Sequence, residues 1–315
     1  MTDRARVRYN RRDTSRKDAM NDVQVWYHKG CADGFGAAWA AWLKLGDAAD
    51  YVPLQYGDKI PEIPAGTREI YMLDFSFKKD MMIGLIQQTF LDGIKFVLLD
   101  HHKTAAEDLD NIAVNNGLHL LRIDQTKSGA VLAWEHFHHS WDVPALLYYV
   151  QDRDLWQWRL PKSRELAVWM RSVPYRFDEW SLIASRLADS HLAEPIFIEA
   201  QAMFRLVESQ VRTIVKHSWI GRVLGFDVPV VNTTLHQSEV GERLNDEHPE
   251  TPFSASYWDR PEGDRVWSLR SRNGFDCQAL ARTVVGGGGH AGAAGFRSTR
   301  GNVVTLTDGH EQVIG

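Results

Sequence analysis

The sequence predicts an α/β protein, in which a doubly wound parallel sheet is joined by a helical connector to a smaller α/β C-terminal domain. Two observations predict this class. Strand-like and helix-like runs alternate along the first half of the chain, which is the pattern of repeated βα units. Beyond a long helical stretch, the composition becomes strand-like again and then rich in glycine. A chain of 315 residues has room for two domains.

Four segments follow from this division: a basic leader over 1–21, a first domain over 22–175, a helical connector over 176–219 and a C-terminal domain over 220–315. The leader is rich in arginine and has little to bury, so we interpret it as disordered. The alternatives are a basic arm that touches nucleic acid and a start assigned too far upstream of Met20.

Hydrophobic periodicity predicts the elements of the first domain. In order, they are a strand at 23–27, a helix at 35–45 that Gly46 can end, a strand at 69–73, a helix at 79–91 and a strand at 95–99. The last strand holds the unbroken apolar run 96–99, which is typical of a strand buried in a parallel sheet. Ser128 can cap a helix over 130–137, and another apolar run, 144–152, ends in acids.

The second half of the chain begins with an amphipathic helical stretch over 177–218. Strand-like runs follow at 228–232, 253–257 and 266–269, before the glycine-rich segment. These elements predict the connector and the smaller domain.

Composition limits the function. A net charge of −5 excludes an overall basic footprint, so a short anionic substrate fits better than a long duplex. The 2 cysteines lie far apart, which favours a reducing cytosol. No apolar stretch reaches the roughly 20 residues that span a bilayer, and the N-terminus lacks a signal peptide. We therefore expect a cytoplasmic protein with no membrane contact; a homodimer is left open.

Ionisable residues follow each predicted strand of the first domain: His28 and Asp33, then Asp74, then the triplet Asp100-His101-His102. Ligands of open α/β sheets bind beyond the carboxyl ends of the strands. Carboxylates gathered there repel one another unless cations neutralise them, and two divalent metals bridged by a carboxylate such as Asp74 would do so. Taken alone, an aspartate directly after a strand, as Asp74 is, is usually the cap of the next helix.

A fourth cluster, Asp152-Arg153-Asp154, adds one acid to this set, and the spacing does not decide between the two aspartates. Its alternative interpretation is a helix end with surface charges. Carboxylates with some imidazole suit manganese or magnesium. Cys31 is a further candidate ligand.

The C-terminal domain offers an anion site. Backbone N–H groups at Gly287, Gly288 and Gly289, followed by His290, can approach a phosphate because no Cβ intervenes. Arg270 and Arg272 share one face of a strand and could reach the same phosphate or stack on a base. The alternatives are a flexible loop and an exposed edge.

In this order, the motifs His28…Asp33-Gly34, Asp74, Asp100-His101-His102 and Asp152/Asp154 resemble the DHH phosphoesterase superfamily, most of all its nano-RNase and RecJ-like exonuclease branch. The run Gly286–Phe296 is similar to the signature of the DHH-associated substrate domain. The resemblance spans about residues 23–300.

The resemblance implies a two-lobed phosphoesterase with a cleft between the lobes and two divalent ions, Mn²⁺ first and Mg²⁺ second. The metal ligands that it implies are His28, Asp33, Asp74, His101 and one of Asp152 and Asp154. Asp100 would be a ligand or would orient a histidine. His102 would contact the scissile phosphate or help to protonate the leaving group. One departure matters: Cys31 stands where the family generally places an aspartate.

The resulting prediction is a two-metal phosphodiesterase acting on short single-stranded RNA or DNA, with Asp100, His101 and His102 as its catalytic residues. The alternatives are a phosphohydrolase for a cyclic dinucleotide, 3′-phosphoadenosine 5′-phosphate or pyrophosphate, and a regulatory nucleotide-binding protein with weakened catalysis. A role in tRNA editing is disfavoured by the metal motifs.

Overall fold

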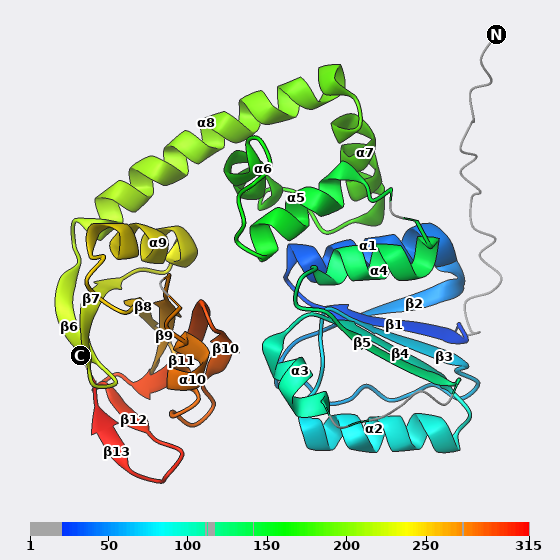
Figure 1. Cartoon of the computed structure of the whole chain (residues 1–315), viewed down its shortest axis with the longest axis horizontal. Helices are drawn as coiled ribbons and strands as arrows, with labels where there is room; N and C mark the ends of the chain where they lie inside the picture. Colours follow the sequence, from blue (N-terminus) through cyan, green and yellow to red (C-terminus); the bar gives the residue numbers. More distant parts are fainter. Residues whose placement is uncertain (1–20, 111, 113–116, 141, 273, 315) are drawn as a thin grey trace.

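The computed structural model describes residues 21–110, 112, 117–140, 142–272 and 274–314; all but the last residue of the predicted leader lies outside them. Two lobes face each other, and the long helix α8 (Ser190–Val215) runs across the top of Figure 1 from one to the other.

The first lobe contains a parallel sheet with the strand order β2-β1-β3-β4-β5. Its strands are β1 (Val23–His28), β2 (Ala49–Leu54), β3 (Glu69–Leu73), β4 (Lys95–Asp100) and β5 (His119–Ile123). The helices α1 (Ala32–Leu45) and α4 (Gly129–His138) cover one face, and α2 (Lys79–Leu91) and α3 (Lys103–Leu109) lie on the other (Figure 1). The short 3-10 helix η1 (Gly46–Ala48) follows α1. The predicted doubly wound class is confirmed.

The alternation of side chains along β4 explains why this sheet is buried on both faces. Val97 and Leu99 pack into the core beneath α1 and α4. Phe96 and Leu98 pack into a second core on the α2 side. Successive strand residues point to opposite faces, so an unbroken apolar run is what two helical layers require.

The strand order reverses between β1 and β3. Adjacent crossovers leave the sheet there on opposite faces, which opens a crevice at the carboxyl ends of the two strands. His28 ends β1, and Asp74 follows β3 directly. The topology therefore places both residues at the crevice.

Three further helices follow the sheet: α5 (Ala145–Asp154), α6 (Ser163–Met170) and α7 (Phe177–Leu187). The core under α1 includes Trp180 of α7 and Ile196 of α8, so the first part of the predicted connector packs on the first lobe. The far end of α8 packs through Val211 and Val215 against Val240 and Leu244 of the second lobe.

The second lobe has a mixed sheet of six strands in the order β10-β11-β9-β8-β7-β6. These strands are β6 (Trp219–Val223), β7 (Phe226–Asn232), β8 (Ser254–Asp259), β9 (Asp264–Arg270), β10 (Gly288–His290) and β11 (Ala293–Thr299). Helices α9 (Gln237–Glu247) and α10 (Cys277–Ala281) accompany the sheet, and β12 (Val303–Thr305) pairs with β13 (Glu311–Val313). No helix among the described residues is long and apolar enough to cross a bilayer.

In the first lobe, the sequence patterns missed the strands β2 and β5 and the helices α3 and α6. Both strands lie at edges of the sheet, where burial is partial and the apolar signal is weak. Pro53 within β2 argues against a central strand but is tolerated at an edge. Part of the glycine run is a strand rather than the flexible loop given as the alternative, because Gly288 and Gly289 pair with β11.

Candidate metal centre and the cleft beside it

Five of the predicted metal ligands, together with His102, meet at the carboxyl edge of the first sheet. Two groups of three side chains form there, and within each group the ligand atoms lie within 4.8 Å of one another. One group is His28, Asp74 and His102; the other is Asp33, His101 and Asp154. Three strand ends and two helix termini supply them.

Asp74 connects the two groups. Its Oδ2 lies 3.4 Å from Nδ1 of His28, and its Oδ1 lies 3.1 Å from Nε2 of His101. These are ion-pair distances without hydrogen-bond alignment: among the described residues, neither oxygen of this buried carboxylate has a hydrogen-bond partner. Buried carboxylate oxygens are normally satisfied, so Asp74 fits a bridge between two cations.

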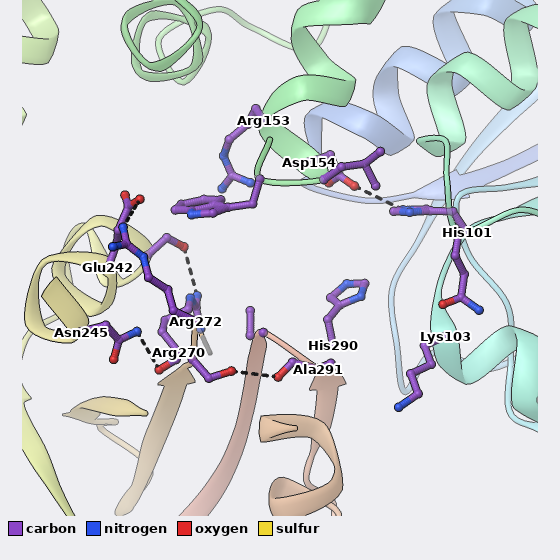
Figure 2. A pocket seen from close by; sticks show the side chains of 17 residues that line it. His101, Lys103, Arg153, Asp154, Glu242, Asn245, Arg270, Arg272, His290 and Ala291 are labelled. Carbon is purple, nitrogen blue, oxygen red and sulfur yellow. Dashed lines mark hydrogen bonds and ion pairs between the residues drawn. The ribbon is translucent and has the colours of Figure 1, made fainter. Parts of the chain in front are cut away.

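His101 completes the second group. Its Nε2 lies 3.3 Å from Oδ2 of Asp154 and 3.6 Å from Oδ2 of Asp33, and Figure 2 shows the approach of Asp154 to His101. Asp33 is held in place by the first turn of α4, where the N–H groups of Gly129 and Ala130 donate to its two oxygens at 2.6 and 2.9 Å. A helix N-terminus suits a carboxylate in this position.

Gly129 was not predicted as a site residue, yet the centre depends on it. A Cβ at this position would lie 2.4 Å from the Cβ of Asp74. Gly34 is similar, since its Cβ would lie 2.3 Å from the carbonyl oxygen of His28. The available signal was Gly129 directly after the Ser128 cap, whose hydroxyl accepts from Val131 N–H at 3.4 Å.

Asp100 supports the triplet. Its Oδ1 accepts from the backbone N–H groups of His101 and His102 at 2.7 and 3.2 Å, and it lies 2.7 Å from Nδ1 of His102. This contact fixes the orientation of the His102 ring. It agrees with the second of the two roles expected for Asp100, that of orienting a histidine. His102 itself stands with His28 and Asp74; its expected contact with phosphate stays a prediction.

The two acids of the fourth cluster have separate surroundings. Asp154 joins His101, whereas Asp152 turns to the following loop, where the N–H groups of Arg159 and Leu160 donate to its oxygens at 2.8 and 3.2 Å. The structure therefore does not bring Asp152 into either ligand group among the described residues. Both of its oxygens already accept hydrogen bonds from backbone N–H groups.

These surroundings predict different outcomes for the same substitution. Asp154→Asn should weaken Mn²⁺ binding and leave the melting temperature nearly unchanged. Asp152→Asn should lower the free energy of unfolding by about 1–3 kcal/mol, because one backbone donor loses its acceptor, while Mn²⁺ affinity is kept. Calorimetric metal titration and thermal denaturation measure the two effects, and the reverse pattern would exchange the roles of the aspartates.

The centre concentrates negative charge. Burial, and then repulsion from Asp74 and Asp154, raises the pKa of Asp33 well above its usual value. Burial opposes ionisation of Asp74 as well, but the imidazoles of His101 and His28 hold its pKa far below the usual range. Burial also disfavours a charged His101, yet contact with Asp74 and the charges of Asp33 and Asp154 raises its pKa to about 10. Such a cluster demands compensating positive charge, and its oxygen and imidazole donors fit Mn²⁺ or Mg²⁺.

Cys31 lies beside this centre at the N-cap of α1, but neither ligand group includes it. Burial raises the pKa of its thiol, and the charges of Asp74, Asp154 and Asp33 raise it further. The second group is complete with Asp33, His101 and Asp154, and the ligand role of Cys31 stays a prediction.

A cavity of about 500 Å³ lies between the metal centre and the second lobe. Figure 2 shows His101, Asp154 and Arg153 on one side of it, and Arg270, Arg272 and His290 on the other. The His290 ring stacks on the ring of His102, with centroids 4.7 Å apart. Partial desolvation between the lobes, with the neighbouring charges of His102 and His101, lowers the pKa of His290 to about 4. The ring is therefore neutral at pH 7.

The two predicted arginines differ in their pairing. Arg270 donates to the hydroxyls of Ser268 and Ser238 at 2.8 and 3.1 Å, and within the described part of the chain it has no carboxylate partner. Burial, followed by the charge of Arg153, lowers its pKa to about 10, so the guanidinium remains charged at pH 7. Arg272, in contrast, is paired with Glu242 at 2.9 Å and with Asp246.

The glycine run lies next to the cavity lining rather than within it, so its predicted contact with phosphate stays a prediction. Gly287, Gly288 and Gly289 do not line the cavity in the described structure; His290, Ala291, Gly292 and Ala293 do. The glycines serve packing instead. A Cβ on Gly287 would lie 2.0 Å from the carbonyl oxygen of Ala281, and one on Gly289 would lie 2.5 Å from that of Ala293.

No family model matches the chain. It is 28% identical over 317 positions to an uncharacterized protein of Acanthamoeba polyphaga mimivirus, covering 91% of this chain and 70% of that protein. Among solved structures, it is similar to an exopolyphosphatase-related protein from Bacteroides fragilis (14% identity, TM-score 0.46) and to exonuclease RecJ bound to manganese (14% identity, TM-score 0.44). Each similarity covers 87% of this chain and 85% of the other. By its motifs, and by their convergence at one edge of the sheet, the chain resembles the DHH phosphoesterase superfamily.

Proposed function

We propose that this chain is a metal-dependent phosphodiesterase of the DHH type, which hydrolyses short single-stranded oligonucleotides with two divalent cations, Mn²⁺ before Mg²⁺. One observation carries the proposal. Two three-ligand groups are connected by the unsatisfied carboxylate of Asp74, and His101 and Asp154 of the second group line a cavity. The far wall of that cavity holds Arg270, a half-buried arginine without a carboxylate partner among the described residues.

Each of the two ligand groups would bind one cation. His28, Asp74 and His102 would hold one cation, and Asp33, His101 and Asp154 the other. Bound there, two divalent cations would activate water and neutralise the charge that develops on the phosphate. Asp100 would keep His102 in its orientation, and the α4 N-terminus would do the same for Asp33.

Arg270 and Arg153 are suited to the phosphate oxygens that the cations leave free. Both line the cavity, and no carboxylate is paired with either among the described residues. A guanidinium remains charged when buried and can donate two parallel hydrogen bonds to a phosphate. This local positive charge supplies the anion site that the net charge of −5 does not.

The cleft favours a short substrate because the lobes are bridged on two sides of the cavity. Lys103 of α3 pairs with Asp276 at the start of α10 at 2.8 Å. Arg164 of α6 pairs with Glu242 of α9 through two bonds of 2.7 and 2.8 Å. A continuous duplex would have to break these contacts, whereas an oligonucleotide of a few residues would not.

The same enclosure admits a second candidate substrate, a small nucleotide phosphoester such as a cyclic dinucleotide or 3′-phosphoadenosine 5′-phosphate. A cavity of about 500 Å³ falls within the range of small-molecule sites. Domain boundaries at 175 and 219, the cytoplasmic location and the homodimer also stay predictions.

The test is a substrate panel incubated with the protein and Mn²⁺. It contains RNA and DNA of 2 to 10 nucleotides, cyclic dinucleotides, 3′-phosphoadenosine 5′-phosphate and pyrophosphate, each with an EDTA-treated control. We expect fastest turnover with the shortest single strands and none after chelation. Fastest turnover of a cyclic or mononucleotide substrate would favour the second candidate. No turnover would contradict both, and a regulatory binding role would replace them.

A further inference from the structure

The loop that follows α5 holds two tryptophans in a backbone conformation that bulky residues rarely adopt. Trp156 and Trp158 both have φ of 55°. This left-handed region is open to glycine and, less readily, to asparagine, but it strains residues with larger side chains. Strain of this kind persists only where its surroundings enforce it, and it gathers at functional positions.

Asp152 enforces the conformation from inside the loop. Its carboxylate accepts from the N–H groups of Arg159 and Leu160, and its carbonyl oxygen accepts from Gln157 N–H at 2.8 Å. The side chain is 4% exposed. The loop is thus wrapped around a buried acid, which leaves its aromatic side chains little freedom.

Only one of the two indoles borders the cavity in the described structure. Trp156 lines it together with Asp154, Arg270 and His290, whereas Trp158 does not. The Arg153 guanidinium lies 5.0 Å from the centroid of the Trp156 ring, and the Trp158 ring packs nearly perpendicular to it at 4.8 Å. The site therefore presents a rigid, electron-rich ring two residues from a predicted metal ligand.

The tryptophan pair is also connected to the second lobe, through Arg164. The Arg164 guanidinium lies 4.5 Å from the Trp158 ring and forms the paired bonds to Glu242 of α9. Glu242 also accepts from Arg272 at 2.9 Å. The aromatic pair is thus fixed to both walls of the cleft, with its position set before any ligand binds.

We propose that Trp156 is the platform on which a base of the substrate stacks, and that it positions the neighbouring phosphate between the metal centre and Arg270. This inference rests on the proposed function and narrows its substrate class to phosphoesters with an aromatic base beside the reacting group. Every base has a π face, so stacking on an indole supports binding with little sequence preference. Pyrophosphate has no such group and gains nothing from Trp156.

The experiment compares adenosine 5′-monophosphate with ribose 5-phosphate, by calorimetry in the presence of Mn²⁺. The protein should bind the nucleotide roughly 5- to 150-fold more tightly than the sugar phosphate, which is the range of one stacked base. Trp156→Leu should remove this preference and leave ribose 5-phosphate binding unchanged. Trp156→Phe, which keeps a π face, should retain most of it.

Trp219→Leu is the matched control, because Trp219 is a half-exposed indole on β6 that does not line the cavity in the described structure. It should leave the base preference intact. If Trp156→Leu lost affinity for adenosine 5′-monophosphate and for ribose 5-phosphate equally, Trp156 would have a structural role and the proposal would be overturned. The proposal would also be overturned if Trp156→Leu kept the preference for the nucleotide, or if the parent protein showed no such preference. A base preference that depends on Trp156 in a protein that hydrolyses no diester would support the platform and contradict the phosphodiesterase.

Discussion

Replacing Asp74 by asparagine should abolish metal-dependent hydrolysis while the protein stays folded. The change removes the charge that faces His28 and His101 and that connects the two ligand groups. Residues that only orient a ligand typically contribute 10- to 100-fold to metal affinity or activity, so the loss at a bridging ligand should exceed a hundredfold. Asparagine is the suitable substitute because Asp74 has a φ of 56°, which asparagine tolerates.

The matched control is Asp124→Asn, at the end of β5 on the same edge of the sheet. Asp124 belongs to neither ligand group, and its Oδ1 accepts from the N–H and the hydroxyl of Thr126. Activity and Mn²⁺ stoichiometry should remain at the parent level. Circular dichroism and thermal denaturation report whether each variant is folded. Substantial turnover by folded Asp74→Asn would contradict the two-metal assignment.

Gly129→Ala should damage the centre without removing any ligand. The added Cβ would lie 2.4 Å from the Cβ of Asp74, so either the start of α4 or Asp74 must move. The N–H of the same residue donates to Asp33, and a shift of α4 would disturb both groups. We expect a loss of about 1–3 kcal/mol in the free energy of unfolding from overpacking and at least a tenfold loss in Mn²⁺ affinity.

Gly84→Ala makes the same change in a helix where the added atom meets nothing within 4 Å. Gly84 is exposed in α2, and alanine there should raise stability by up to about 1 kcal/mol, since glycine is the poorer helix former. Denaturant unfolding and metal titration compare the two variants. If Gly129→Ala binds Mn²⁺ as the parent does, the close packing of α4 on Asp74 has no part in the centre.

The parts of this fold that the sequence predicted are those with strong local signals. The run 96–99 is apolar on both faces, and Gly46 has the positive φ, 59°, expected after a helix. Edge strands such as β2 carry a weaker signal, because their residues are only partly buried and their pairing is set by the rest of the sheet.

The residues of the candidate site also fall into those that the sequence could place and those that it could not. Residues at strand ends could be placed together from topology alone, as His28, Asp74 and His101 were. The choice between Asp152 and Asp154 depended on which side chain the following loop captures, and that loop has no periodic pattern. Gly129 and Trp156 became visible only through contacts between segments distant in sequence.

The central claim is that two cations bind at one edge of the sheet with Asp74 between them. Anomalous diffraction at the manganese edge, from crystals grown with Mn²⁺, tests it directly. We predict two peaks roughly 3.5–4 Å apart, one beside His28, Asp74 and His102 and the other beside Asp33, His101 and Asp154. A single peak, or peaks away from these side chains, would contradict the account.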